Sequence, residues 1–370
     1  MARHYLDYGS AAPVRPEVVA QLTELLPHLG ADPGRLHAEA LVVRDLIEQS
    51  REVVASYLGV AARRVIFTSG IAESIASATF GVLSRSAERG VAASALERSA
   101  VLANAGRYGT HLAVGTLANG QLDLESFAAA LNGGAGLAWC QLANQETGIL
   151  QPLAEAATLA VAASVPLACD LSGGLPYALP DAQVDVLVAG AEAFGAPAGV
   201  GILVLREPLR LEPLLIGGAQ ERARRAGLEN TLGICALAAA VRASEAQREA
   251  EAARLAELQV RVDRGLSAVA GVRLIDGGGS SRVPSTSCFT VDGVEAEAVL
   301  VALERRGVAV HSGSACASEA LEASPVLAAM GLDANHGLRI TTGWATTHAD
   351  VDALLESFEP AVSELRALRA

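Results

Sequence analysis

Lysine is absent from the 370 residues of this chain, so all 28 basic residues are arginine. Because the lysine ε-amine is the side-chain group that forms imines with carbonyl compounds, no side chain of this protein can carry out Schiff-base chemistry. Two explanations for the absence stay open. We favour a coding bias toward arginine over selection against amines, which reactive thioesters or a lysine-tagging system would modify.

Long apolar runs are also missing, because charges and glycines interrupt every apolar stretch before it reaches the roughly 18 residues of a membrane span. The N-terminus, MARHYLDYGSAAP, lacks the apolar segment of a secretory signal. No basic stripe offsets the net charge of −13, which disfavours binding to nucleic acid. We therefore expect a soluble, cytoplasmic protein with neither a membrane nor a nucleic-acid partner.

Cysteine is scarce, and its spacing excludes two kinds of site. The five cysteines are Cys140, Cys169, Cys235, Cys288 and Cys316. No CxxC or Cys/His spacing occurs, so the sequence predicts neither a disulfide framework nor a metal site. We expect most of these residues to be small core residues. Cys316 is the exception, because the small residues and glycine of HSGSACAS are typical of an accessible loop.

Apolar strand-like runs alternate with helix-period segments in the N-terminal part of the chain. The expected strands are 65–68, 136–143, 166–170, 184–188 and 199–205. The helical patterns between them include 72–84 and 153–163. This alternation predicts an α/β fold with a mainly parallel sheet, helices on both faces, and functional loops at the carboxyl ends of the strands.

The C-terminal part has a different pattern. A long helical segment at 232–269 precedes short strands at 272–275, 287–291 and 337–341 and helices at 295–306 and 349–358. This order predicts a smaller α+β unit. Because 370 residues exceed one compact core, we expect two domains. Residues 15–245 form the large α/β domain, and residues 1–14 and 246–370 form the small one.

Seven sequence blocks, in order along the chain, carry a resemblance to a known family. They are YLDYGSAAPVRPEVV (5–19), ADPGRLHAEA (31–40), FTSGIAES (67–74), ANQETGILQP (143–152), GGAQERARRAGLEN (217–230), HSGSACAS (311–318) and LRITTGWATTHADVD (338–352). They resemble the cysteine desulfurases of the class V aminotransferase group. The resemblance implies the fold of type I pyridoxal-phosphate (PLP) transferases. In that family PLP forms an imine with a lysine, and a loop cysteine takes the substrate sulfur as a persulfide and leaves alanine.

The resemblance breaks at the cofactor positions. In DVLVAGAEAFGAPAG (185–199), the family's serine, histidine and lysine fall on Gly190, Glu192 and Ala193. Four further cofactor contacts of the family are replaced, and the replacing residues are Ala72, Arg98, Gly173 and Leu228. The residues that match a vestigial pocket are Ser69, Gly70, Asn144 and Asp170.

These replacements lead to an expectation about the cofactor. Each lost hydrogen bond to a charged phosphate is worth about 1.5–3 kcal/mol. Four losses remove about 6–12 kcal/mol, compared with about 8 kcal/mol for micromolar binding. We therefore expect no cofactor, with non-covalent PLP as the alternative. We also expect Arg98 to enter the pocket and pair with Asp170 or Glu192, the alternative being that Arg98 points to solvent.

Two candidate catalytic residues remain. Cys316 matches the sulfur carrier, and His311 lies close enough in sequence to lower the pKa of its thiol. Arg339 matches the arginine that binds the substrate carboxylate, although a structural salt bridge is the alternative, and Trp344 replaces a second family arginine. We expect no active PLP-dependent desulfurase in this chain on its own.

The resemblance implies three candidate functions. The first is a degenerate desulfurase homologue that acts as a partner or regulatory protein in sulfur trafficking or iron–sulfur assembly. The second is a thiol or persulfide relay through Cys316. The third is an enzyme that uses non-covalent PLP or another ligand. The implied partners are a second copy in a homodimer or an active desulfurase in a heterodimer, together with a sulfur-acceptor or scaffold protein.

Overall fold

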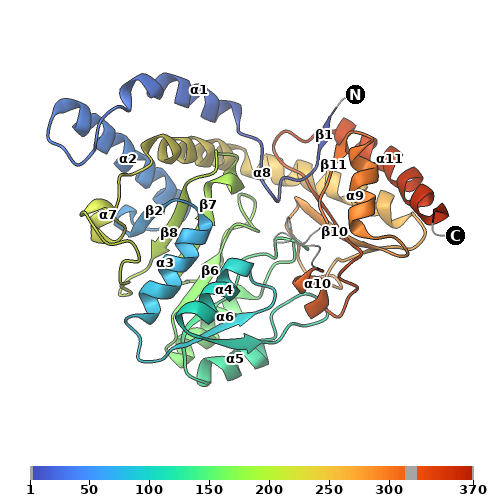
Figure 1. Ribbon diagram of the computed structural model, residues 1–370, viewed down its shortest axis with the longest axis horizontal. Coiled ribbons are helices and arrows are strands. Elements are labelled where there is room, and N and C mark those ends of the chain that lie inside the picture. Colours follow the sequence, from blue (N-terminus) through green and yellow to red (C-terminus); the bar gives the residue numbers. More distant parts are fainter. Residues whose placement is uncertain (1–2, 313–322, 369–370) are drawn as a thin grey trace.

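A seven-stranded mixed sheet forms the centre of the larger part of the molecule in the computed structural model, which describes residues 3–312 and 323–368 (Figure 1). The strands are β2 (Val65–Thr68), β3 (Gly90–Ser94), β4 (Thr110–Val114), β5 (Ala135–Trp139), β6 (Leu167–Asp170), β7 (Val186–Gly190) and β8 (Gly201–Leu205), in the spatial order β2-β8-β7-β6-β5-β3-β4. Only β8 runs antiparallel to its neighbours among these strands. The predicted α/β class with a mainly parallel sheet is confirmed.

Alternation along the strands sends successive side chains to opposite faces of the sheet. In β2, Val65 and Phe67 join one hydrophobic cluster and Ile66 joins the other. The first cluster is covered by α2 (Ala38–Tyr57), α5 (Leu124–Asn132) and α6 (Leu153–Ala163). The second is covered by α3 (Ile71–Leu83) and α4 (Ser99–Tyr108). Helices therefore cover both faces, as the pattern predicted, and α1 (Pro16–Leu25) packs outside them against α8.

The long helix α8 (Thr231–Ser267) connects the two parts of the molecule (Figure 1). The side chain of Asn230 caps its first turn by accepting a hydrogen bond from Gly233 N. Residues near its start, such as Ile234 and Val241, belong to the cluster on the large sheet. Residues near its end, such as Leu258 and Leu266, belong to a separate cluster in the smaller part.

The smaller part is built on a three-stranded antiparallel sheet in the order β12-β10-β9. Its strands are β9 (Val272–Leu274), β10 (Thr286–Val291) and β12 (Gly337–Thr341), and its helices are α9 (Ala296–Glu304), α10 (Pro325–Ala329) and α11 (His348–Ala367). The N-terminal strand β1 (His4–Tyr5) pairs with β11 (Val308–Ala309), so both chain ends meet here. The domain limits of 15–245, and of 1–14 with 246–370, remain a prediction.

Two element boundaries differ by more than two residues from the sequence expectation. The strand expected over 136–143 ends at Trp139, and beyond it the side chains of Gln141 and Asn144 donate hydrogen bonds to Leu96 O. The helix expected to end at residue 358 continues through Pro360 to Ala367. The four cysteines in the described residues are free and buried, as expected of core residues. In the same residues, no helix combines the length and apolarity needed to cross a membrane.

Candidate functional site

A pocket lies where the carboxyl ends of β6 and β7 meet the N-terminal segment and the smaller part of the molecule. Its walls include Tyr8, Arg15, Arg98, Tyr177, Glu192, Ala193 and Trp344. The free space inside is about 100 Å³. Small-molecule sites commonly enclose roughly 300–1,000 Å³, so side chains fill much of this one.

Arg98 and Asp170 form an ion pair in this pocket. Asp170 ends β6 with its side chain 6% exposed, and the Arg98 Nε lies 2.9 Å from its Oδ2. The other carboxylate oxygen, Oδ1, accepts a hydrogen bond from Ser172 N at 2.8 Å. The prediction that Arg98 turns into the pocket is confirmed for its pairing with Asp170, and the solvent-facing alternative is wrong.

Glu192 occupies space that only a glycine at position 190 leaves open. A Cβ built on Gly190 would lie 2.0 Å from the Glu192 Oε1. Because that distance is far below any van der Waals contact, a serine at position 190 is incompatible with this position of the Glu192 side chain. A larger residue at position 190 would therefore require the Glu192 side chain to move. Ala193 presents only a methyl group to the pocket.

The loop after Asp170 has no room for a side chain at position 173. A Cβ on Gly173 would lie 2.1 Å from the carbonyl oxygen of Ala143. Any residue larger than glycine at position 173 would therefore require a different backbone. The neighbouring Ser172 Oγ is enclosed and has no hydrogen-bond partner among the described residues.

The N-terminus of α3, which follows Ser69 and Gly70, already holds a carboxylate. Ser69 N donates to the Glu73 Oε2 at 2.8 Å, and the Arg225 Nε lies 2.8 Å from the Glu73 Oε1. Burial acts to raise the pKa of Glu73, but the hydrogen bonds from Arg225 and Ser69 hold it below its usual range. In the described conformation, this N–H group is therefore bound to Glu73.

Asn144 organises the turn after β5. Its Oδ1 accepts hydrogen bonds from Glu146 N at 2.9 Å and Thr147 N at 3.0 Å, and its Nδ2 donates to Leu96 O at 3.1 Å. Glu146 in the same turn is buried and accepts a hydrogen bond from the Ser324 hydroxyl. Burial raises the pKa of Glu146 to about 7. A ligand-binding role for Asn144 remains a prediction.

Arg339 is fully buried on β12 and binds one of the chain's own acids. Its Nη2 lies 2.9 Å from the Asp7 Oδ1 and donates to the Ser10 Oγ at 2.8 Å, and its Nη1 donates to Gln145 O. The guanidinium thereby fixes the N-terminal segment against the pocket. Its role as a ligand carboxylate contact remains a prediction.

The candidate sulfur carrier Cys316 lies outside the described residues. His311, which precedes it, exchanges backbone hydrogen bonds with Arg339. Burial, together with the positive charge of Arg339, lowers the pKa of His311. An effect of His311 on the Cys316 thiol remains a prediction.

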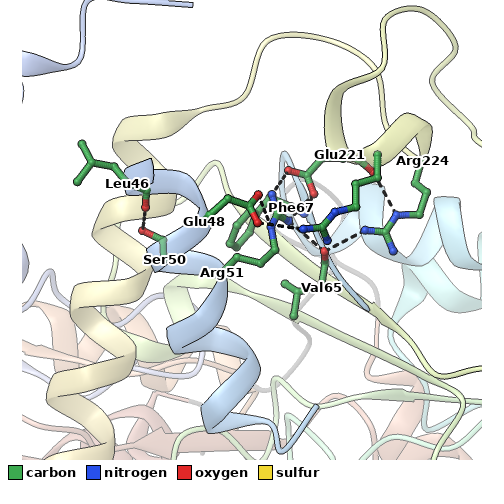
Figure 2. Close-up of polar contacts among 9 residues, drawn as sticks. Leu46, Glu48, Ser50, Arg51, Val65, Phe67, Glu221 and Arg224 are labelled. Carbon is green, nitrogen blue, oxygen red and sulfur yellow. Dashed lines mark hydrogen bonds and ion pairs between the residues drawn. The ribbon is translucent and has the colours of Figure 1, made fainter. Parts of the chain in front are cut away.

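The 217–230 block is held by a buried ion-pair network, which Figure 2 shows. The Arg51 guanidinium forms two hydrogen bonds to the Glu221 carboxylate, at 2.7 and 2.8 Å, and Phe67 N donates to the same carboxylate. Arg224 donates to Glu221 O and Val65 O. Leu228, which replaces a family threonine, is 63% exposed. Leu228 is therefore exposed on a segment that buried ion pairs hold in place.

Three residues of the site were missed from the sequence. Arg15 and Tyr177 line the pocket, and Glu97 lies enclosed beside Arg98. Arg15 precedes Pro16 at the start of a helix and Tyr177 lies in a proline-containing loop, so neither position carries a local signal of a binding residue. Only the fold brings them together.

Comparison with known proteins places the chain in a family. The sequence profile of the family Aminotransferase class-V matches residues 4–354. A cysteine desulfurase of Cereibacter sphaeroides is 34% identical, with 100% of this chain and 98% of the relative covered. Cysteine desulfurase 2 of Trichormus variabilis is 33% identical, with 98% and 94% covered. A solved structure of a NifS-like protein superposes with a TM-score of 0.90 at 25% identity, covering 98% of this chain and 100% of its own.

This relationship corrects the expectation that the protein takes no cofactor. Cysteine desulfurases depend on PLP, so similarity over the whole chain points to PLP rather than to none. The described residues nevertheless do not fit an imine-linked PLP. Position 193 is alanine, Asp170 is bound to Arg98, and Ser69 N is bound to Glu73. Any PLP here lacks a covalent link to a lysine of this chain.

The fold and the near-complete coverage agree with these relatives. Four of the replaced cofactor positions, Arg98, Gly173, Glu192 and Ala193, line the pocket. The chain belongs to the class V aminotransferase family and, within it, groups with the cysteine desulfurases, whose function concerns sulfur.

Proposed function

We propose that this protein is a degenerate desulfurase homologue that forms no Schiff base from its own side chains. It acts as a partner or regulatory protein in sulfur trafficking or iron–sulfur assembly. The observation that carries the proposal is the Arg98–Asp170 ion pair at 2.9 Å, beside a methyl group at position 193. Asp170, which matches a residue of the family's cofactor pocket, is here bound to the Arg98 guanidinium.

We propose a homodimer, or a heterodimer with an active desulfurase, in the cytoplasm. The support is the 217–230 block and its flanks, where several large apolar side chains are exposed on an anchored segment. They are Leu215, Ile216, Leu228 and Leu232, with exposed fractions of 41%, 88%, 63% and 37%. Several large exposed apolar side chains on one segment are typical of protein interfaces.

The first experiment measures alanine and sulfide release from L-cysteine with PLP present, using this protein alone and an active desulfurase as the positive control. We expect no release above a protein-free blank, because no lysine is available for the imine. When this protein is added to the active desulfurase, we expect it to change that enzyme's rate or to co-purify with that enzyme. Release of alanine by this protein alone contradicts the proposal.

The retained HSGSACAS segment supports the relay as a second candidate. In the relay, the Cys316 thiolate attacks the outer sulfur of a donor persulfide, so the sulfur moves and the donor thiolate leaves. Incubation with an active desulfurase and L-cysteine, followed by intact-mass measurement, is expected to show an adduct of one sulfur atom. The Cys316→Ser variant tests the carrier, and an adduct that persists in this variant rules out Cys316.

A third candidate, an enzyme that uses PLP without an imine, is supported by the family relationship. Equilibrium dialysis with PLP separates it from the other two. Stoichiometric binding together with turnover of an amino acid supports this candidate, and binding without turnover leaves the regulatory role.

A further inference from the structure

We propose that Arg15 and Tyr177 form a binding site for the carboxylate of a small ligand, separate from Arg339 and Arg98. The proposal rests on the pocket geometry and does not depend on sulfur transfer. Both residues line the pocket between the large sheet and the smaller part. Neither position belongs to the cofactor or substrate residues that the family resemblance identifies.

Arg15 is a buried cation without an acidic partner. The residue is 2% exposed, its Nε donates to Phe194 O at 2.9 Å, and its Nη1 donates to the Gln247 Oε1 at 3.0 Å. These acceptors are neutral. In the described part of the chain, no carboxylate forms an ion pair with Arg15, although Glu17 and Glu251 lie in its vicinity. A buried charge is strongly unfavourable unless it is paired, so this guanidinium favours an anion.

The other arginines around the pocket differ in this respect. Arg98 is paired with Asp170, Arg254 with Glu251, and Arg339 with Asp7. An incoming carboxylate would have to displace an internal carboxylate at each of these three. Arg15 requires no such exchange, so a ligand anion is expected to bind there first.

Arg15 and Tyr177 have donors that the protein leaves unused. The Arg15 Nη2 has no acceptor among the described residues, and it is not among the enclosed unpartnered atoms. Because Arg15 lines the pocket, we infer that this nitrogen faces the pocket. The Tyr177 hydroxyl is in the same situation. A guanidinium N–H and a phenol O–H together match the two oxygens of a carboxylate.

The size and walls of the pocket limit the ligand. The free space is about 100 Å³, whereas a cavity of about 150 Å³ holds benzene with its six heavy atoms. A ligand of about four or five heavy atoms therefore fits without rearrangement. Phe194 and the Trp344 ring, which lies 5.6 Å from the Arg15 guanidinium carbon, offer apolar walls for its tail.

The Glu192 carboxylate lies in the same pocket and opposes the binding of an anion. It lies against Gly190 and forms no ion pair within the described residues. It repels an anion, so its charge weakens the binding of a simple carboxylate. Removing that charge is therefore expected to tighten binding, which is the opposite sign to the effect of removing Arg15.

The test uses Trp344 as a reporter, because Trp139, the other of the two tryptophans, is fully buried in the sheet core. Propionate, with five heavy atoms, is titrated against the full-length protein and compared with propionamide, its uncharged isostere. We expect saturable quenching by propionate, at least about tenfold weaker binding of propionamide, and loss of the signal in Trp344→Phe. Calorimetry provides a second readout.

Four variants test the residues. Arg15→Gln is expected to weaken propionate binding about tenfold or more and Tyr177→Phe several-fold, whereas Glu192→Gln strengthens it. Arg273→Gln, at a surface arginine with a 72% exposed side chain, is the matched control and leaves binding unchanged. If Arg15→Gln does not fold, the Tyr177→Phe variant and the propionamide comparison decide.

Three outcomes overturn the proposal. The first is equal binding of propionate and propionamide, and the second is wild-type affinity in both Arg15→Gln and Tyr177→Phe. The third comes from a parallel titration with PLP. If PLP binding depends on Arg15 while propionate does not bind, the anion recognised is a phosphate, and the assignment to small carboxylates is wrong.

Discussion

At the scale of single residues, Glu97 is a buried carboxyl group next to Arg98 in the sequence. Its Oε1 accepts a hydrogen bond from Gln141 N at 2.9 Å, and its Oε2 is enclosed without a partner in the described part of the chain. Burial raises the pKa of Glu97 to about 8. The carboxyl group of Glu97 is therefore mostly protonated at pH 7.

Glu97 makes the stability of the protein depend on pH. Because the pKa of Glu97 is higher in the folded protein than in the unfolded chain, its contribution is complete below about pH 4.3 and is lost as the pH rises toward about 8. The loss is at most about 1.4 kcal/mol per pH unit. Glu97→Gln keeps the acceptor but removes the titration. Urea unfolding at pH 5 and pH 8.5 should show a smaller pH effect in the variant, and equal effects contradict the assignment.

The Arg98–Asp170 pair is expected to couple energetically. Asp170→Asn leaves the Arg98 guanidinium, whose side chain is 23% exposed, beside an uncharged partner. We expect a loss of about 2 kcal/mol in the free energy of unfolding, less than for a fully buried pair because solvent screens Arg98. Arg98→Met completes a double-mutant cycle with a coupling of about 1–3 kcal/mol. Additive effects would mean that the pair contributes nothing.

At the scale of elements, α7 (Gln220–Ala223) contains an unusual backbone. Glu221, Arg222 and Ala223 have φ values of 47°, 58° and 61°, in the left-handed region. Such a conformation costs about 1–2 kcal/mol per residue for any side chain with a Cβ. The Glu221 carboxylate offsets this cost through its bonds to Arg51 and Phe67 N. The network in Figure 2 therefore maintains a strained turn next to the exposed Leu228.

Because of this strain, an alanine-to-glycine substitution is expected to have opposite effects on the free energy of unfolding in α7 and in α8. Ala223→Gly is expected to stabilise the protein by up to about 1 kcal/mol, since glycine adopts a positive φ without steric cost. The control, Ala246→Gly on the exposed face of α8, is expected to destabilise it by about 1 kcal/mol. Both values come from urea unfolding at one pH. Destabilisation by Ala223→Gly would show that the turn is not strained.

Elements with a strong local pattern were predictable, and elements defined by their neighbours were not. The helix expected over 153–163 agrees with α6. The buried strand β3, with the small residues GVAAS, has no alternation and takes its identity from pairing with β4 and β5. The pairing of Arg98 with Asp170 followed from charge at matched family positions. The approach of Arg15 to Tyr177 did not, because it depends on how the N-terminal segment folds back onto the large sheet.

At the scale of the whole molecule, the absence of lysine leaves the N-terminal α-amine as the only primary amine of the chain. Incubation with PLP followed by borohydride reduction is therefore expected to give at most one pyridoxyl adduct, in the N-terminal peptide. Peptide mapping by mass spectrometry locates it. The Ala193→Lys variant is the matched control, because it supplies an amine at the pocket. A pyridoxyl adduct on any internal peptide of the unsubstituted protein contradicts this prediction.

The helix α8 runs unbroken from Thr231 to Ser267, which corresponds to about 55 Å at a rise of about 1.5 Å per residue. It is anchored in the large hydrophobic cluster at one end and in the small one at the other. A rod of this length acts as a lever: a tilt of about 1° at the first end moves the second by about 1 Å. A partner that binds near Leu232 can therefore change the width of the pocket between the two parts of the molecule without contacting that pocket.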